Sequence, residues 1–310
     1  MKLAFLYAGQ GSQKEKMGLD FYNAYPQIQH IFHNKNAGFD IAQACFSAPL
    51  EQLSQTRYTQ ACLAAFAAIV TDLLYERGIK PNYAAGLSLG EYSALYASGV
   101  FDIDTLIDLL AYRGKVMAET TKGLDTKMVA VMGLESDLIR TEVEKASNSG
   151  KGIVACANFN CKGQTVIGGH SSAVDCAVSL CTAAGARRCL PLNVSAPFHT
   201  PIMKEAAILM AGKLTDTVFG NMSVPIIFNA TGDFLVEDQS IAHLLEIQVK
   251  MPVLFEKTIL KLSDYGVDTV IEIGPGNAIA GFIKKTAPHI KVHSIDNVAS
   301  FIETLKALEV

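Results

Sequence analysis

The sequence lacks the uninterrupted apolar run of roughly 18 residues that a membrane-spanning helix needs. Half of its 310 residues are hydrophobic, but the longest apolar stretches lie inside amphipathic patterns. The strand-like run Leu3–Ala8 is too short for the core of a signal peptide, and Gly9–Gln13 follows it in place of a cleavage site. We therefore expect a cytoplasmic protein without a membrane partner.

Metal and redox cysteine motifs are missing too. The seven cysteines include no C-x-x-C pair, and the closest pairs lie five residues apart, at Cys156–Cys161 and Cys176–Cys181. Because that spacing fits neither a zinc ribbon nor a redox centre, we interpret these thiols as core or inert residues and expect no metal ion. The net charge of −4 gives no basic excess, so we expect no nucleic acid partner either.

The chain is long enough for one large domain with a small insert, and it shows no internal repeat or low-complexity segment. Strands and helices alternate in both flanks, which predicts a mostly parallel α/β sheet covered by helices, like the core of the α/β hydrolases. The expected strands lie at residues 2–8, 84–86, 224–229, 269–273 and 291–295, and the expected helices at 63–73, 91–96, 103–118, 201–214, 252–262, from 277 and at the end of the chain.

The middle of the chain has a different order of elements. Strand patterns at 128–132, 153–157, 164–167 and 189–193 combine with helix patterns at 135–146 and 172–184. This βαββαβ order is typical of a ferredoxin-like unit. We predict a large catalytic domain formed by residues 1–124 and 194–310, with a small ferredoxin-like subdomain at 125–193.

One motif has the setting of a nucleophile elbow. Gly86-Leu87-Ser88-Leu89-Gly90 joins a short apolar run to a helix expected to begin at Glu91. G-x-S-x-G in this strand, turn, helix context raises a serine hydroxyl on a sharp turn, and the glycines allow strand and helix to approach closely. The motif alone would arise by chance about one time in ten in a glycine-rich chain, so its context carries the argument. Ser88 is the candidate nucleophile.

Arg113 lies on the apolar stripe of its predicted helix, three residues after Leu110 and four before Met117. A guanidinium that faces inward needs an anion. One interpretation is structural: an ion pair with a nearby carboxylate such as Glu91, or a side chain that reaches past the core to water. The other is a fork that binds a substrate carboxylate beside Ser88 by two parallel hydrogen bonds.

His199 is the best candidate for a general base among the seven histidines. It lies on a loop stiffened by Pro197, with Thr200 as an expected N-cap and Pro201 as the first residue of the next helix. A packed or surface histidine is an equally good interpretation of the same pattern. Since no acidic residue stands in an orienting position, a neutral carbonyl is the expected partner of the imidazole. A base of that kind suffices for a thiolate leaving group, which needs little help from an acid.

Together these segments resemble one family, the malonyl-CoA:acyl carrier protein transacylases, which are related to the acyltransferase domains of polyketide synthases. The resemblance covers essentially the whole chain, in order. It is carried by Gly9–Gln13, Gly86–Tyr92, Tyr112–Gly114, Ala157–Asn160, Pro197–His199, Gln248 before Pro252, and Gly274–Gly276.

The resemblance implies a role for each matched residue. Ser88 would become malonylated, His199 would be its base, and Arg113 would bind the malonyl carboxylate. The backbone carbonyl of Gln248 would orient His199. From the residues alone, an amide at the end of a helix is the better interpretation of Gln248.

Further implied roles concern the walls of the site. The backbone N–H groups of Gln10 and Leu89 would form the oxyanion hole, and Leu89 and Phe198 resemble the pattern in which side-chain bulk excludes an α-methyl branch. Asn160 would help to fix the site, although a turn residue is as good an interpretation. The sequence departs from the family at Leu87, where most members have histidine before the nucleophile. This change affects the polarity of the pocket wall.

The implied reaction moves a malonyl group from malonyl-CoA to the phosphopantetheine thiol of an acyl carrier protein, through a malonyl-serine. It needs no tightly bound cofactor, since the coenzyme A thioester is the substrate. We expect a monomer whose local basic residues meet the acidic carrier protein. Two alternatives remain: a serine esterase or thioesterase, for which Arg113 would have no use, and a non-catalytic module that docks carrier proteins.

Overall fold

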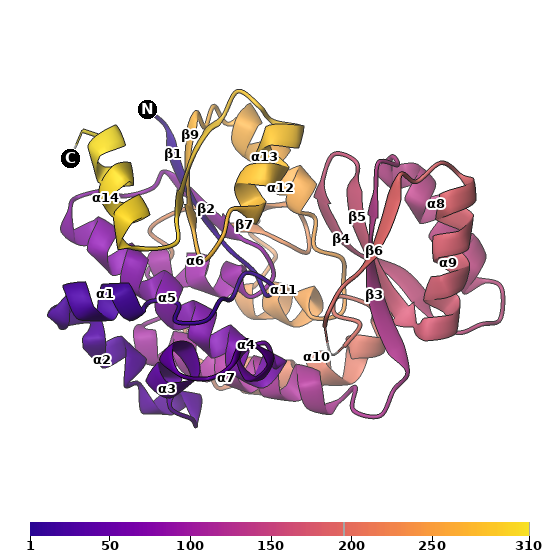
Figure 1. The fold of residues 1–310 in the computed structure, drawn as a ribbon, viewed down its shortest axis with the longest axis horizontal. Coiled ribbons are helices and arrows are strands. Elements are labelled where there is room, and N and C mark those ends of the chain that lie inside the picture. Colours follow the sequence, from indigo (N-terminus) through magenta and orange to yellow (C-terminus); the bar gives the residue numbers. More distant parts are fainter. Residues whose placement is uncertain (195, 310) are drawn as a thin grey trace. The chain divides into compact units, whose positions relative to one another are not determined.

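The computed structural model describes residues 1–194 and 196–309 (Figure 1). The chain forms two compact units. The first unit comprises Met1–Lys115, Thr217–Phe228 and the chain from Leu260 onward, and the second comprises Val116–Asp216 and Asn229–Ile259. Each unit is built around its own β-sheet.

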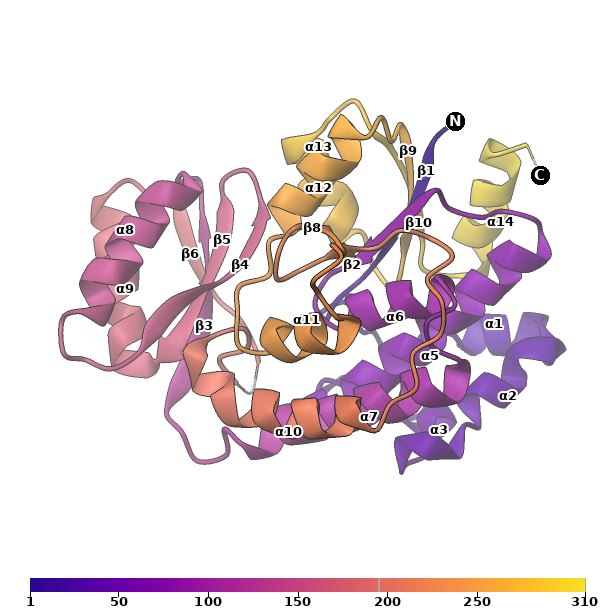
Figure 2. The ribbon, with the colours of Figure 1, turned by 180° about the vertical axis from the view of Figure 1, so that it is seen from behind.

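The first unit contains a parallel sheet in the order β10, β9, β1, β2. These strands are Lys291–Ile295, Thr269–Ile273, Leu3–Tyr7 and Tyr83–Gly86. Every residue of β1 and β9 is buried, as expected where helices cover both faces of a sheet (Figures 1 and 2). The predicted parallel α/β sheet is therefore confirmed.

The direction in which successive strands are added to the sheet reverses between β9 and β1. From β1 the chain proceeds to β2 on one side, whereas from β9 it passes through α13 (Ala278–Thr286) to β10 on the other side. In open α/β sheets, loops at the carboxyl ends of the strands beside such a switch point form ligand sites. The loops that contain Gln10 and Ser88 follow β1 and β2 at this edge.

The long helix α5 (Thr56–Glu76) is the core helix of the first unit. Its length and composition would suit a membrane span, but 83% of its most apolar window is buried inside the structure. The short helices before α5 were not predicted, because elements of three to six residues carry too little periodicity. They are α1 (Leu19–Ala24), η1 (Pro26–Ile28), α2 (Gln29–Phe32), η2 (Lys35–Ala37), α3 (Ile41–Phe46) and α4 (Leu50–Leu53).

Most other helices agree with their predicted positions, including α6 (Gly90–Ala97), α7 (Ile103–Glu119), α12 (Phe255–Asp264) and α14 (Val298–Ala307). The predicted helix at 201–214 begins as η3 (Pro201–Met203) and continues as α10 (Lys204–Thr215). The predicted strand at 224–229 is shorter, with β7 at Ile227–Phe228; Ile226 forms a parallel bridge with Ala84 at the edge of β2. Neither β8 (Asp233–Phe234) nor α11 (Ile241–Gln248) was predicted.

The second unit contains an antiparallel sheet in the order β4, β5, β3, β6. These strands are Val154–Cys161, Gln164–His170, Thr126–Met132 and Arg188–Pro191. Helices α8 (Ser136–Ser147) and α9 (Ser171–Ala183) cover one face of this sheet (Figure 1). The connectivity and strand order are those of a ferredoxin-like unit, in agreement with the predicted βαββαβ order.

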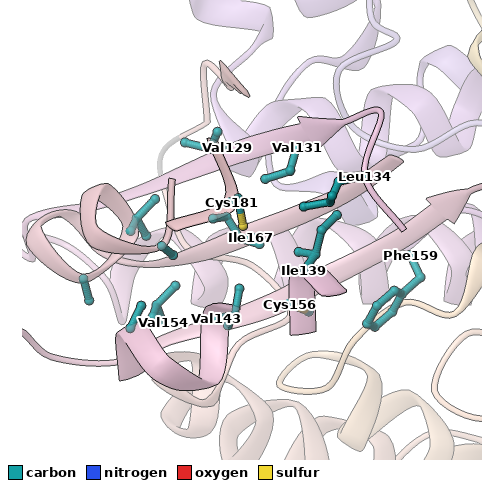
Figure 3. Packing of buried hydrophobic residues seen from close by; sticks show 14 residues of the cluster. Val129, Val131, Leu134, Ile139, Val143, Val154, Cys156, Phe159, Ile167 and Cys181 are labelled. Carbon is teal, nitrogen blue, oxygen red and sulfur yellow. The ribbon is translucent and has the colours of Figure 1, made fainter. Parts of the chain in front are cut away.

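The core of this subdomain lies between its sheet and its two helices (Figure 3). Val129, Val131 and Ile167 project from the strands, and Ile139 and Val143 face them from α8. Two of the predicted core thiols, Cys156 and Cys181, lie in the same cluster. Burial raises the pKa of the Cys156 thiol to about 12. A thiol with such a pKa stays protonated at neutral pH, which agrees with an inert packing role.

Candidate active site

The turn between β2 and α6 holds Ser88 in a strained backbone conformation. Its φ of 58° lies in the left-handed region, which non-glycine residues seldom adopt. The neighbouring glycines are required by close contacts: a Cβ on Gly86 would lie 2.0 Å from the carbonyl carbon of Gly90, and one on Gly90 would lie 2.4 Å from the oxygen of Tyr7. The glycines of the motif therefore allow the sharp turn that exposes Ser88.

The loop after β1 packs directly against this turn. A Cβ on Gly9 would lie 2.7 Å from the carbonyl oxygen of Leu87, so only glycine permits the approach. The amide Nε2 of Gln10 donates a hydrogen bond to Oγ1 of Thr56 at 3.0 Å. Leu89 follows Ser88 at the N-cap position of α6, where backbone N–H groups point out of the helix. Gln10 and Leu89 thus lie on two adjoining loops.

Arg113 lies beside Ser88. Its Nη2 donates to Oγ of Ser88 at 3.0 Å, and its Nη1 donates to Oε1 of Gln60 at 2.7 Å. The residue is 1% exposed, and its Cζ lies 5.6 Å from the centre of the Tyr92 ring, a cation–π distance. The structure therefore joins the predicted nucleophile and the predicted carboxylate-binding group.

The charged guanidinium of Arg113 is buried. Burial lowers the pKa of the guanidinium, whereas the neighbouring Tyr92 and Glu91 raise it. Burial also raises the pKa of Tyr92, which keeps the phenol neutral. Glu91, three residues after Ser88 in the first turn of α6, is fully buried. An arginine stays charged in proteins, so an incoming carboxylate would meet a fixed, desolvated cation.

His199 is the second strained residue of the candidate site, with a φ of 60° and 3% exposure. Its Nδ1 lies 2.7 Å from the backbone oxygen of Gln248, and its backbone N–H donates to the oxygen of Val249 at 3.2 Å. A carbonyl oxygen can only accept, so Nδ1 carries the proton in this contact. The other nitrogen, Nε2, is then the basic one.

The other candidate residues of the second unit lie on the His199 loop, on β4 and at the end of α11. Thr200 occupies the N-cap position before η3, as predicted, but its hydroxyl donates to the carbonyl of Pro197 at 2.6 Å and does not cap the helix. Phe198 is buried beside them. Asn160 is buried on β4, and its Oδ1 accepts no hydrogen bond from the residues that the structure describes. The carbonyl of Gln248 is exposed to His199 because α11 ends there.

The candidate residues are divided between the two units. Gln10, Leu87, Ser88, Leu89 and Arg113 belong to the first unit, and Asn160, Phe198, His199 and Gln248 belong to the second. Sequence reasoning missed the residues that support them. Thr56 and Gln60 are polar side chains four residues apart at the start of a helix that is mostly apolar, and that spacing was the available signal.

Residues 1–194 and 196–309 contain no group of three or more histidine, cysteine, aspartate or glutamate side chains that could hold a metal ion.

Comparisons with known proteins identify related acyl transferases. A family model described as acyl transferase domain matches residues 4–304. The malonyl CoA-acyl carrier protein transacylase of Bacillus subtilis (strain 168) is 34% identical to this chain, and the match covers 98% of both.

Two solved structures extend this likeness. A malonyl CoA-acyl carrier protein transacylase from Clostridium perfringens has a TM-score of 0.94 and 36% identity, covering 100% of this chain and 98% of its own. A malonyl-transacylase in complex with its type II PKS acyl-carrier protein has a TM-score of 0.94 and 34% identity, covering 99% of this chain and 100% of its own. On these matches, the chain belongs to the acyl transferase domain family.

Proposed function

We propose that this acyltransferase moves a malonyl group from malonyl-CoA to the phosphopantetheine thiol of an acyl carrier protein, through a malonyl ester on Ser88. The observation that carries the proposal is the 3.0 Å contact between Nη2 of the buried Arg113 and Oγ of Ser88. A three-carbon acyl group on Ser88 would end in a carboxylate within reach of that guanidinium. We further propose a cytoplasmic monomer that supplies fatty acid synthesis.

The first step forms the acyl-enzyme. Nε2 of His199 takes the proton of the Ser88 hydroxyl, and Oγ attacks the thioester carbonyl of malonyl-CoA. The backbone N–H groups of Gln10 and Leu89 donate to the oxyanion of the tetrahedral intermediate. Collapse of the intermediate breaks the C–S bond, and the proton on His199 leaves with the coenzyme A thiol.

The second step reverses the first with a new thiol. His199 removes the proton of the phosphopantetheine thiol, and the sulfur attacks the ester carbonyl of malonyl-Ser88. When this intermediate collapses, Oγ of Ser88 regains the proton from His199. The Gln248 carbonyl keeps the imidazole in the tautomer that both steps require.

Substrate choice follows from charge and from side-chain bulk. A neutral acyl group would lack the carboxylate that Arg113 is proposed to bind, and would therefore forgo a charge-assisted hydrogen bond. Leu89 and Phe198 are both buried, and their bulk is proposed to exclude an α-methyl branch. Leu87 gives an apolar wall where most family members have histidine; the chemistry is retained because the base is His199. Asn160 is proposed to help fix the site from β4.

Basic side chains on the second unit are the proposed contact for the acidic carrier protein. Lys162, Arg187 and Arg188 are exposed at one end of the ferredoxin-like sheet, in the proposed subdomain at 125–193. Their turns adjoin each other, since Gly133 N–H donates to the oxygen of Gly163 and Arg187 N–H donates to the oxygen of Met132. Like charges in one place suit an anionic partner.

Charge reversal at this end tests the carrier-protein contact. Lys162→Glu or Arg188→Glu should raise the KM for carrier protein and leave the KM for malonyl-CoA unchanged. Lys151→Glu serves as a matched control, because this exposed lysine precedes β4 and lies at the opposite end of the sheet from Lys162. An equal rise in both KM values would remove these residues from the docking surface.

The rival activity is a serine hydrolase, since the elbow around Ser88 would suit an esterase as well. Incubation with malonyl-CoA and a holo carrier protein separates the two. The proposal expects malonyl-carrier protein as the product. Release of malonate to water would identify a thioesterase, and the absence of any Ser88-dependent malonyl adduct would leave a docking module without catalysis.

A further inference from the structure

Helix α5 carries three buried polar residues at its N-terminal end, and two of them, Thr56 and Gln60, lie four residues apart. Thr56 is 2% exposed and Gln60 is 1% exposed, in a helix whose other buried positions are mostly apolar. Residues four apart lie on the same face of a helix, one turn above the other. A buried polar side chain stays stable only with hydrogen-bond partners, so the partners of this face show what it supports.

The partner of Thr56 is Gln10. Oγ1 of Thr56 accepts the hydrogen bond from Nε2 of Gln10 at 3.0 Å. The loop that carries Gln10 packs through Gly9 on the carbonyl of Leu87, the residue before the nucleophile. Thr56 therefore fixes the side chain of the residue whose backbone N–H is the proposed oxyanion donor.

The partner of Gln60 is Arg113. Oε1 of Gln60 accepts from Nη1 at 2.7 Å, and Nη2 of the same guanidinium donates to Oγ of Ser88 at 3.0 Å. Because the guanidinium is planar and rigid, holding one nitrogen fixes the direction of the other. The ring of Tyr92 supports the same group at 5.6 Å from Cζ.

The hydrogen bonds of Thr56 and Gln60 lie where α5 packs closely against α7. A Cβ on Gly114, the residue after Arg113, would lie 2.5 Å from the carbonyl oxygen of Thr56. The absence of a side chain at Gly114 thus allows the backbone that carries Arg113 to rest on the first turn of α5. The first turn of α5 therefore positions both groups that are proposed to face the substrate, the backbone N–H of Gln10 and the guanidinium of Arg113.

We propose that Thr56 and Gln60 are positioning residues with separable effects. Gln60 aims Arg113 and thereby sets the preference for acyl groups that end in a carboxylate. Thr56 holds the Gln10 loop and thereby sets the rate of acylation for every acyl group, charged or neutral. This inference rests on the proposed malonyl transfer.

The test is the rate of acyl-enzyme formation, measured by intact mass with malonyl-CoA and, in separate reactions, with saturating acetyl-CoA. Gln60→Leu should lower the malonyl rate about tenfold or more, the loss of one aimed hydrogen bond to a charged group, and lower the acetyl rate much less. Thr56→Val should lower both rates by the same factor. Thr59→Val is the matched control, because this fully buried threonine on α5 donates to the backbone oxygen of Leu53 and not to the site.

Gln60→Glu adds a second readout that a fold defect would not mimic. The new carboxylate has the shape of the amide and would pair with Arg113, so malonyl loading should fall further than in Gln60→Leu while acetyl loading persists. Equal losses for both acyl groups in the Gln60 variants, or a changed malonyl preference in Thr56→Val, would overturn the inference. If the wild-type protein forms no malonyl adduct, the proposed function fails instead.

Discussion

Ser88 and His199 both have a strained backbone, but different contacts enforce the strain at each residue. Both adopt left-handed backbone conformations, with φ of 58° and 60°, and they lie in different units of the chain. Ser88 is held by its immediate neighbours, the glycines at 86 and 90. His199 is held by a segment 49 residues later, through the carbonyl of Gln248 and the backbone of Val249.

Backbone strain is therefore visible in the sequence at Ser88 but not at His199. A turn imposed by flanking glycines is written in five consecutive residues, so a motif can predict it. A histidine fixed by the end of a distant helix leaves no local pattern. Backbone strain of this kind persists only where surrounding contacts enforce it, and it is concentrated at functional sites.

The largest expected effect comes from removing either side chain. Ser88→Ala and His199→Ala should each lower malonyl transfer by about four to six powers of ten, because the proposed nucleophile and its proposed base would act as one unit. Steady-state transfer to carrier protein measures the loss. The double variant should be no worse than the weaker single one; additive losses would show that the two residues act separately.

The elbow should be less tolerant of added bulk than the rest of the chain. Gly86→Ala would place its Cβ 2.0 Å from the backbone of Gly90, so we expect a loss of more than about 3 kcal/mol in unfolding free energy or no folded protein. Gly212→Ala on α10 is the control, because its Cβ would meet nothing within 4 Å. That change should stabilise by about 0.5 to 1 kcal/mol. Urea titration would detect both, and a folded, stable Gly86→Ala protein would contradict the close contact.

A smaller effect on stability is expected from relieving the backbone strain at Ser88 and His199. Glycine tolerates a φ near 60°, so Ser88→Gly and His199→Gly should each be more stable than the corresponding alanine variant by about 1 kcal/mol. Thermal melting of the four inactive proteins provides the comparison. If alanine is as stable as glycine at only one of the two positions, the strain there is relieved when the side chain is removed.

The smallest expected effect is a pH dependence within the first unit. Glu272 on β9 accepts hydrogen bonds from the N–H groups of Ile279 and Ala280 and from the hydroxyl of Ser294. Burial raises its pKa above the usual 4.5. The folded protein then holds this proton more tightly than the unfolded chain, so stability should fall as pH rises from 4.5 through the folded pKa.

Glu272→Gln isolates this contribution, because glutamine keeps an acceptor oxygen and cannot titrate. Urea unfolding between pH 4.5 and 7 should show a shallower pH dependence in the variant than in the wild type. Identical slopes would mean that Glu272 has the same pKa in the folded and unfolded chains.

Sequence reasoning reached those parts of the fold that local patterns encode. Strands β9 and β10 occupy the predicted ranges, and the βαββαβ order of the insert was readable because each element is long enough to show its period. The helices of three to six residues before α5 were missed for the opposite reason. Helix α11, whose end supplies the carbonyl beside His199, was missed as well.

The candidate site was predictable to a similar extent. Ser88 and Arg113 were found from a motif and from a charge on an apolar stripe, and the structure places them in contact. Thr56 and Gln60 were not found, because their role depends on which helices pack together. The close approach of α7 to α5 at Gly114 brings Arg113 to Gln60, and the loop after β1 brings Gln10 to Thr56.

Arg113 is proposed to select a carboxylate-bearing acyl group for Ser88. Intact mass, measured after the protein is mixed with equimolar malonyl-CoA, acetyl-CoA and methylmalonyl-CoA, tests this selection. We predict a malonyl adduct that depends on Ser88, and in Arg113→Ala a malonyl signal reduced by orders of magnitude relative to acetyl. An Arg113→Ala protein that loses all adducts equally, or keeps its malonyl preference, would contradict the account.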